Sequence, residues 1–240
     1  MEPRPSVIQT RLKDVNRVIA VASGKGGVGK SMVASNLALS LAKQGKKVGL
    51  LDLDLYGPSS HLILGFNPDG FPDEEHGIIP QEIHDIKFMS LVYFSEDKPG
   101  AFRGDDVTNI ILELLAITRW DDLDYLILDL PPGIGDETLD VISYIPQTEF
   151  LVVTTPSKVA FGAVEKLLKI LIEGKLPLLG VIENMTRDSS EYISKKVSKL
   201  NVSYLGYLSY DAQVEDAIGD PLKLLETNLS KDILKVSKKL

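Results

Sequence analysis

Eight residues near the start of the chain have the composition of a loop that wraps a phosphate group. Residues 24–31 read GKGGVGKS, which fits the pattern G-x-x-x-x-G-K-[ST]. Glycines let successive backbone N–H groups turn toward phosphate oxygens, and a helix that follows adds the positive end of its dipole. Lys30 would reach the β and γ phosphates, and the Ser31 hydroxyl would bind Mg²⁺. The pattern therefore predicts a site for a nucleoside triphosphate with magnesium.

The same glycines also satisfy a second pattern, G-x-G-x-x-G, which is typical of dinucleotide-binding proteins. Gly24, Gly26 and Gly29 supply the glycines, and Asp52 lies about where a ribose-binding acid is expected. A Lys-Ser pair directly after the last glycine is superfluous for a pyrophosphate but necessary for a triphosphate with magnesium. We therefore favour the triphosphate site. A nicotinamide-dependent oxidoreductase and a purely structural glycine turn are the alternatives.

Aspartates follow two of the predicted strands. Asp52 and Asp54 come after the second strand, and Asp129 ends the run YLILD. Because the carboxyl ends of parallel strands meet at one edge of a sheet, these side chains should face the Ser31 end of the phosphate loop. Each aspartate taken alone fits a helix N-cap equally well. Together they predict a magnesium shell of Ser31, Asp52, Asp54 and Asp129, which bind directly or through water.

A loop rich in proline and glycine follows Asp129. Residues 129–136 read DLPPGIGD, in which the prolines fix the entry and the glycines let the backbone swing. A segment that senses the γ phosphate needs these properties. We therefore predict a switch segment, called switch II, that comprises Pro131, Pro132, Gly133, Gly135 and Asp136. An ordinary strand-to-helix loop, capped by Asp136, is the alternative.

Short apolar runs alternate with helical patterns along the chain. The predicted strands are residues 17–23, 47–51, 87–91, 125–129, 149–154, 178–183 and 202–208, and the predicted helices are 30–44, 107–117, 139–145, 161–173, 191–200 and 229–240. This alternation is typical of an α/β fold with a mostly parallel central sheet flanked by helices. Without a repeat or linker, residues 1–240 should form one domain, with an N-terminal extension at 1–16.

Composition and charge exclude several other classes of function. The chain has 240 residues, of which 44% are hydrophobic, and its 34 acidic and 26 basic residues give a net charge of −8. This balance argues against a broad nucleic-acid-binding surface. The absence of cysteine excludes disulfides, thiolate nucleophiles and iron–sulfur clusters held by this chain's own thiolates. We find neither a signal peptide nor an apolar run of membrane length, so we expect a cytoplasmic protein.

Residues 229–240 combine an apolar face with lysines. The apolar side chains are Leu229, Ile233, Val236 and Leu240. A basic amphipathic helix of this kind can lie on an anionic membrane. Because so few apolar residues would contribute, we favour a helix docked on the protein core and keep membrane contact as the second alternative.

Several stretches of the sequence together resemble one family. They are GKGGVGKS, VGLLDLDLYGPS at 48–59, FRG at 102–104, DYLILDLPPGIGDE at 124–137 and GVIENM at 180–185. Lys25 is similar to the signature lysine of the deviant Walker A motif in the MinD and ParA superfamily. The combination, over residues 18–222, resembles the Mrp/ApbC-type iron–sulfur cluster carrier ATPases. The resemblance implies the three-layer P-loop NTPase fold and a slow ATP hydrolase that uses Mg²⁺.

The resemblance also implies roles for particular residues. Lys25 would cross a homodimer interface to the partner's nucleotide, in the manner of an arginine finger, and Asp54 would orient the attacking water. Lys25, Lys30 and Asp54 are thus the expected catalytic residues, and Asn184 would hydrogen-bond the adenine. The expected ATP-binding residues are Gly24, Lys25, Gly26, Gly27, Val28, Gly29, Lys30, Ser31, Met32 and Asn184.

One departure from the family pattern concerns the residues that would bind an iron–sulfur cluster. Carriers of this type usually have a CPxC pair shortly after the GVIENM segment, whereas here Met185 is followed by TRDSSE. The resemblance therefore implies that this chain binds ATP and forms a homodimer around it. It does not imply that this chain ligates a cluster. The implied partners are iron–sulfur scaffold or acceptor proteins, without sequence-specific nucleic acid. Two functions stay open: iron–sulfur cluster assembly with cysteines supplied by a partner or lost altogether, and a partitioning or positioning switch.

Overall fold

The centre of the protein is one eight-stranded sheet. The computed structural model describes residues 4–54, 57–68, 70–94, 104–133, 135, 142, 144–187 and 191–240. The strand order is β3-β4-β2-β5-β1-β6-β7-β8, and all neighbours are parallel except β3 and β4. The strands are β1 (Val15–Ser23), β2 (Val48–Asp52), β3 (Gln81–Ile83), β4 (Ile86–Ser90), β5 (Leu123–Asp129), β6 (Thr148–Thr154), β7 (Leu178–Thr186) and β8 (Tyr204–Ser209). The expected α/β fold is confirmed.

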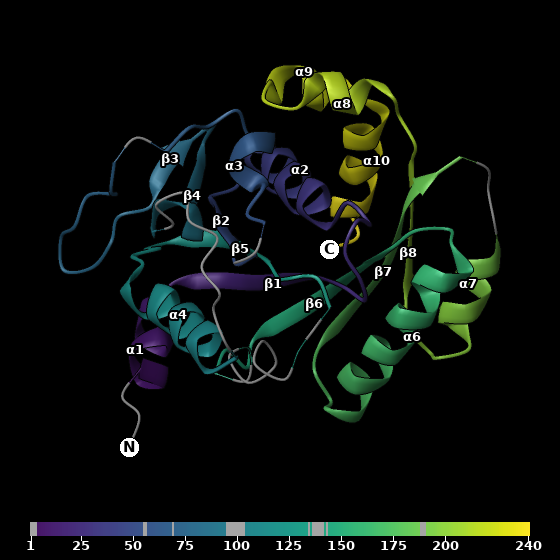
Figure 1. Cartoon of the computed structure of the whole chain (residues 1–240), viewed down its shortest axis with the longest axis horizontal. Coiled ribbons are helices and arrows are strands. Elements are labelled where there is room, and N and C mark those ends of the chain that lie inside the picture. The colour runs from purple at the N-terminus through teal and green to yellow at the C-terminus, as the bar shows by residue number, and fades with distance from the viewer. Residues whose placement is uncertain are drawn as a thin grey trace.

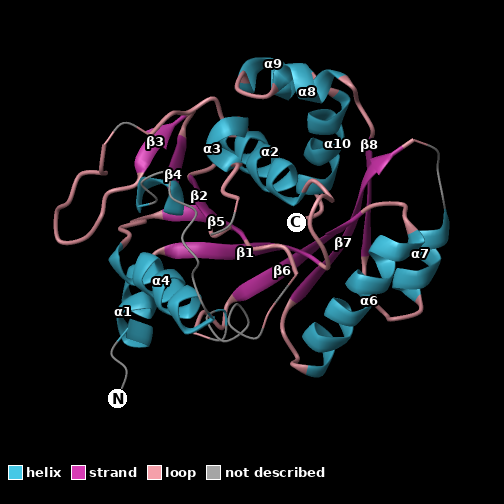
Figure 2. Ribbon diagram, viewed as in Figure 1, coloured by secondary structure: helices cyan, strands magenta, loops and turns pink. Residues whose placement is uncertain are grey.

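Helices cover both faces of this sheet (Figures 1 and 2). One face carries α2 (Lys30–Ala42), α3 (Ser60–Ile63), α8 (Gln213–Ala217), α9 (Pro221–Glu226) and α10 (Asn228–Ser237). The other face carries α1 (Arg4–Arg11), α4 (Gly104–Ile117), α6 (Lys158–Glu173) and α7 (Glu191–Ser198). Every residue of β2 is consequently buried, as are the last six of β1. Burial on both faces explains why these strands have continuous apolar sequences rather than alternating ones.

The stretch interpreted as an N-terminal extension contains the helix α1, which packs against α4. Ile8 is fully buried and Leu12 is 1% exposed, so this segment contributes to the core. The edge strand β3 and the helices α8 and α9 were also not expected from the sequence. Most of the helix predicted at residues 139–145 lies outside the described residues, as do Phe102 and Arg103.

The C-terminal helix α10 is docked on the protein. It packs against α2 and β8, and its apolar side chains Leu229, Ile233 and Val236 are buried. Asp232 fixes the helix to β8, because its carboxylate accepts hydrogen bonds from the backbone N–H and the hydroxyl of Ser209, at 3.0 and 2.7 Å. The face considered for membrane contact is therefore occupied by the core. In the described residues, no helix combines the length and the apolar character needed to cross a membrane.

Candidate nucleotide site

Three central strands bring the predicted site residues to one edge of the sheet. β1 lies between β5 and β6, and the phosphate loop connects the end of β1 to the start of α2. Asp129 at the end of β5 pairs in register with Val21 of β1 and with Asp52 of β2. The two carboxylates therefore lie beside the loop, as the sequence predicts.

The phosphate loop needs glycine at particular positions. Gly27 and Gly29 have φ angles of 76° and 78°, a region that residues with a side chain rarely adopt. A Cβ atom on Gly24 would lie 2.5 Å from the backbone of Ala163 in α6, and one on Gly29 would lie 2.4 Å from the Asn184 amide nitrogen. Space and backbone conformation thus explain the glycines at positions 24, 27 and 29, independently of any bound phosphate.

Lys30 and Asp129 form a buried ion pair inside this loop. Their side chains are 6% and 0% exposed, and the Lys30 ammonium donates to the Asp129 carboxylate. The other Asp129 oxygen accepts a hydrogen bond from the Ser60 hydroxyl at 3.3 Å. Burial raises the pKa of the Asp129 carboxyl, and Lys30 acts in the opposite direction. The lysine assigned to the phosphates is therefore held by the aspartate assigned to magnesium.

Asp52 organises the segment that follows β2. Its buried carboxylate accepts hydrogen bonds from the backbone N–H groups of Asp54, at 3.0 Å, and of Ser59 and Ser60, at 3.1 Å. These bonds satisfy donors at the start of α3, which has no cap from its own N-cap side chain. Burial, together with the charge of Asp129, raises the pKa of Asp52 to about 7. This structural role was not predicted from the sequence.

A cavity of about 390 Å³ opens beside the loop and contains the other predicted residues. Lys25, Ser31 and Asp54 line it, and the side chain of Lys25 is exposed. The backbone carbonyl of Lys25 accepts a hydrogen bond from the Ser23 hydroxyl at 3.0 Å. One Asp54 oxygen accepts the Gly57 N–H at 3.1 Å. The structure thus brings these residues together around a space open to solvent.

The predicted switch II contacts the beginning of the phosphate loop. Gly133 donates its N–H to the carbonyl of Ser23 at 3.1 Å, and the exposed Pro132 lines the same cavity. Pro131 is buried and Gly135 is partly buried, whereas Asp136 lies outside the described residues. Because Ser23 also bonds to Lys25, the two loops meet at this residue.

Asn184 lies within β7 rather than at its end. Its amide nitrogen donates to the carbonyl of Val28 in the phosphate loop at 2.9 Å, and its side chain is almost fully buried. It also lines a second cavity of about 270 Å³, together with Gly29, Met32 and Tyr210. Asn184 therefore braces the phosphate loop, a contact that the sequence did not indicate. The second cavity lies next to the loop, with which it shares Gly29.

The donor set fits a magnesium ion that is held mainly by its nucleotide. Among the described residues, no three His, Cys, Asp or Glu side chains gather as a ready metal site. Ser31 lines the first cavity, while both oxygens of Asp129 are already engaged by Lys30 and Ser60. Mg²⁺ commonly uses one or two protein oxygens with phosphate oxygens and water. Ser31 is thus the protein ligand that fits best, and Asp54 lines the same cavity, whereas the buried Asp52 does not.

Comparisons with known proteins identify relatives of this chain. Residues 14–233 match the ParA family model described as NUBPL iron-transfer P-loop NTPase. An iron–sulfur cluster carrier protein from Pseudomonas fragi is 41% identical over 177 residues, which cover 72% of this chain and 62% of that protein. One from Aquifex aeolicus is 36% identical over 254 residues, which cover 98% of this chain and 70% of that protein.

A solved structure extends the comparison to nucleotide binding. A nucleotide-binding protein from Archaeoglobus fulgidus, in complex with ADP and containing cobalt, is 31% identical, with a TM-score of 0.76 and 92% of each chain covered. The family match includes the phosphate loop and both acidic strand ends. The chain therefore belongs to the iron-transfer P-loop NTPases of the ParA family.

Proposed function

We propose that this protein binds and hydrolyses Mg–ATP, and that ATP controls a homodimer that takes part in iron–sulfur cluster assembly or transfer. The observation that carries the proposal is the convergence of the phosphate loop, Lys30, Asp52 and Asp129 at one sheet edge beside an open cavity. The matched region covers 62% of the Pseudomonas fragi relative. The partners and the cargo of this chain are therefore part of the proposal.

Lys30 and Asp54 have different tasks in this proposal. Lys30 would exchange Asp129 for the β and γ phosphates, because a phosphate offers more negative charge than one carboxylate. Magnesium, held by Ser31 and the nucleotide, would supply positive charge at the phosphate oxygens. Asp54 would orient the attacking water from the cavity wall, and Asp52 would keep Asp54 in place through its hydrogen bond to the backbone.

Lys25 would act on the nucleotide of a second copy. Lys30 already serves the nucleotide bound by its own chain, so a second lysine in the loop has no evident task there. The Lys25 side chain is exposed at the rim of the cavity, and a long lysine can reach a phosphate held by a facing subunit. Two sites that face each other in this way would form an isologous dimer with ATP at the interface.

The iron–sulfur cluster would be cargo whose thiolate ligands come from a partner. The chain has no cysteine, and clusters are ordinarily held by thiolates. A scaffold or acceptor protein would then supply the ligands, while ATP sets when this protein engages it. A partitioning or positioning switch is the second candidate, and the missing cysteines are the observation that favours it. The names of the family model and of the relatives favour the carrier function.

The role of Lys25 is testable by sedimentation with a non-hydrolysable ATP analogue. We expect Lys25→Ala to bind ATP but to lose nucleotide-dependent dimerisation and most hydrolysis. Lys46→Ala, which removes an exposed lysine outside the cavity, should behave like the wild type. Equal association and turnover in Lys25→Ala would refute the trans-acting role.

The cargo is testable by anaerobic reconstitution with iron and sulfide. The pure protein should retain no stoichiometric [4Fe–4S] cluster, as judged by iron content and absorption. Added to a cluster-loaded scaffold protein and a cysteine-bearing acceptor, it should change the rate of cluster transfer from scaffold to acceptor in an ATP-dependent manner. A stable cluster on the isolated chain would contradict the partner-supplied ligands, and no effect on transfer would favour the switch alternative.

A further inference from the structure

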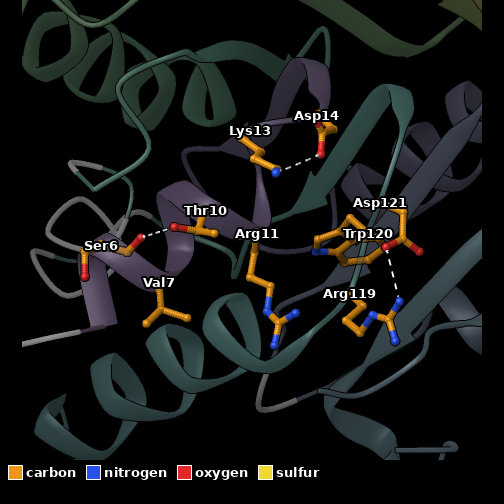
Figure 3. A pocket seen from close by; sticks show the side chains of 9 residues that line it. All are labelled: Ser6, Val7, Thr10, Arg11, Lys13, Asp14, Arg119, Trp120 and Asp121. Carbon is orange, nitrogen blue, oxygen red and sulfur yellow. Dashed lines mark hydrogen bonds and ion pairs between the residues drawn. The ribbon is translucent and has the colours of Figure 1, made fainter. Parts of the chain in front are cut away.

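A third cavity, of about 570 Å³, lies at the opposite end of the sheet from the phosphate loop. Residues of α1 and of the segment before β5 line it, among them Arg11, Lys13, Arg119 and Trp120 (Figure 3). Lys13 precedes β1, whereas the phosphate loop follows β1. At about 3.3 Å per residue, the nine residues of β1 separate the two sites by roughly 30 Å. No step of the proposed ATPase uses this cavity.

The acidic side chains of this cavity are already paired. Asp14 lies 3.8 Å from the Lys13 ammonium, and Asp121 lies 3.7 Å from Arg119, as the dashed lines in Figure 3 show. Lys87 adds a second contact to Asp121 at 3.3 Å. These carboxylates therefore do not offer an unbalanced negative charge to a ligand.

Arg11 is a fixed cation without a carboxylate. Its Nε donates to the Ala116 carbonyl at 3.1 Å, and its Nη2 donates to the His76 carbonyl. Both acceptors are neutral, and within the described part of the chain Arg11 forms no ion pair and its Nη1 no hydrogen bond. Gly77 makes room for it, because a Cβ atom there would lie 2.7 Å from Nη2. The guanidinium is thus held in place by Nε and Nη2, and the N–H groups of Nη1 are available to a ligand.

Trp120 lies buried beneath this cavity, beside the cation. The side chain is fully buried, and its Cε3–Cζ3 edge packs so closely on Gly49 that a Cβ atom there would lie 2.9 Å away. The opposite edge carries Nε1, which has no hydrogen-bond acceptor among the described residues. In Figure 3 this edge of the ring is turned toward the side of the cavity that holds Arg11. Val7, which is 40% exposed, adds an apolar wall from α1.

We propose that this cavity binds a small organic monocarboxylate, with the carboxylate on Arg11 Nη1 and the carbon skeleton against the exposed side chain of Val7. The volume falls in the range of small-molecule sites. One unpaired guanidinium matches one negative charge, and charge-assisted hydrogen bonds from a guanidinium to a carboxylate are strong. A phosphate dianion would need further unpaired cations, which the paired Lys13 and Arg119 do not supply. The inference stands independently of the ATPase function.

The single tryptophan gives this proposal a specific readout. Trp120 is the only tryptophan in the chain, so its fluorescence and its one indole N–H resonance report on this cavity. The full-length protein is titrated with the monocarboxylates butyrate, valerate and 3-hydroxybutyrate, with butyramide as the uncharged match and inorganic phosphate as the competing anion. We expect at least one carboxylate to give a saturable shift, while butyramide and phosphate give none.

Two variants test the assigned contacts, and one serves as a control. Arg11→Gln should weaken binding at least about tenfold, the loss expected for one charge-assisted hydrogen bond. Since Arg11 also bonds to two backbone carbonyls, Val7→Glu provides a second test: it places a repelling carboxylate on an exposed helix position. Lys47→Gln, in an exposed ion pair outside this cavity, should bind like the wild type.

The outcomes that overturn the proposal are equally specific. No saturable shift with any of the carboxylates would refute the site. Binding of inorganic phosphate as tight as that of the carboxylates would refute the ligand class. Unchanged affinity in both Arg11→Gln and Val7→Glu, with folding verified by circular dichroism, would place the ligand elsewhere.

Discussion

The contribution of the buried Lys30–Asp129 ion pair to the stability of the nucleotide-free protein can be tested quantitatively. Asp129→Ala would leave the Lys30 ammonium buried without its carboxylate. Removing one partner of a buried pair costs about 3–5 kcal/mol of stability. With exposed fractions of 6% and 0%, solvent screens this pair little, so the full range applies. We therefore expect a large loss in the free energy of unfolding.

A double variant distinguishes the net contribution of the ion pair to stability from the cost of leaving one buried charge unpaired. In Lys30→Met/Asp129→Leu, apolar side chains replace both charges, and such replacements are often neutral or stabilising. The raised pKa of Asp129, which burial causes, indicates that the attraction of Lys30 does not fully offset the loss of hydration. The double variant should consequently recover most of the stability that Asp129→Ala loses, although it cannot bind ATP.

The assay is urea unfolding without nucleotide, followed by circular dichroism. For a slope of roughly 3 kcal/mol per molar urea, Asp129→Ala should lower the midpoint by about 1–1.7 M. Asp122→Ala is the matched control, because it breaks the Lys47–Asp122 pair, whose side chains are 65% and 66% exposed; its midpoint should not move measurably. A shift for Asp129→Ala no larger than this control, or a double variant as unstable as the single one, would refute the reasoning.

Three further predictions concern other parts of the molecule. Asp54→Ala should lower kcat much more than it weakens ATP binding, because its carboxylate would act mainly in the transition state; turnover and calorimetry check this. Asn184→Ala should weaken ATP binding about tenfold in calorimetry, since it leaves the buried Val28 carbonyl unpaired. Asp232→Asn should cost about 1.5 kcal/mol at neutral pH. Burial alone would raise the pKa of Asp232, but hydrogen bonds from Lys235 and Ser209 outweigh it and lower the pKa. This stabilisation is present above the unfolded carboxyl pKa of about 3.9 and is lost as pH falls through the native value, so urea midpoints of wild type and Asp232→Asn should converge in acid.

The sequence predicted the sheet and the phosphate loop because their signals are local. A glycine loop between an apolar strand and a helix can be recognised from one short stretch of sequence. The positions of the aspartates are predicted once the ends of the strands are known. α1 was not recognised because it has only one fully buried side chain, Ile8, and no clear apolar period. β3 is an antiparallel strand of three residues, too short for an alternating pattern.

The pairings inside the site were not predictable for a different reason. Lys30 and Asp129 are 99 positions apart, and Asn184 and Val28 are 156 apart. A motif states which side chains reach a site, but it does not state which of them bind each other before a ligand arrives. That depends on the register of β5 against its neighbours and on the length of β7. The roles of Lys25, Asp54 and Asp136 in catalysis and switching stay predictions.

The central position of β1 has a consequence for how the chain is made. β1 leaves the ribosome early, yet its two neighbours, β5 and β6, follow more than a hundred residues later. At about 5–20 residues per second, the apolar strand waits on the order of ten seconds without its neighbours. The phosphate loop at its end cannot take shape before Asp129 and β7 have emerged. The nucleotide site is therefore completed late in synthesis, after most of the chain has been made.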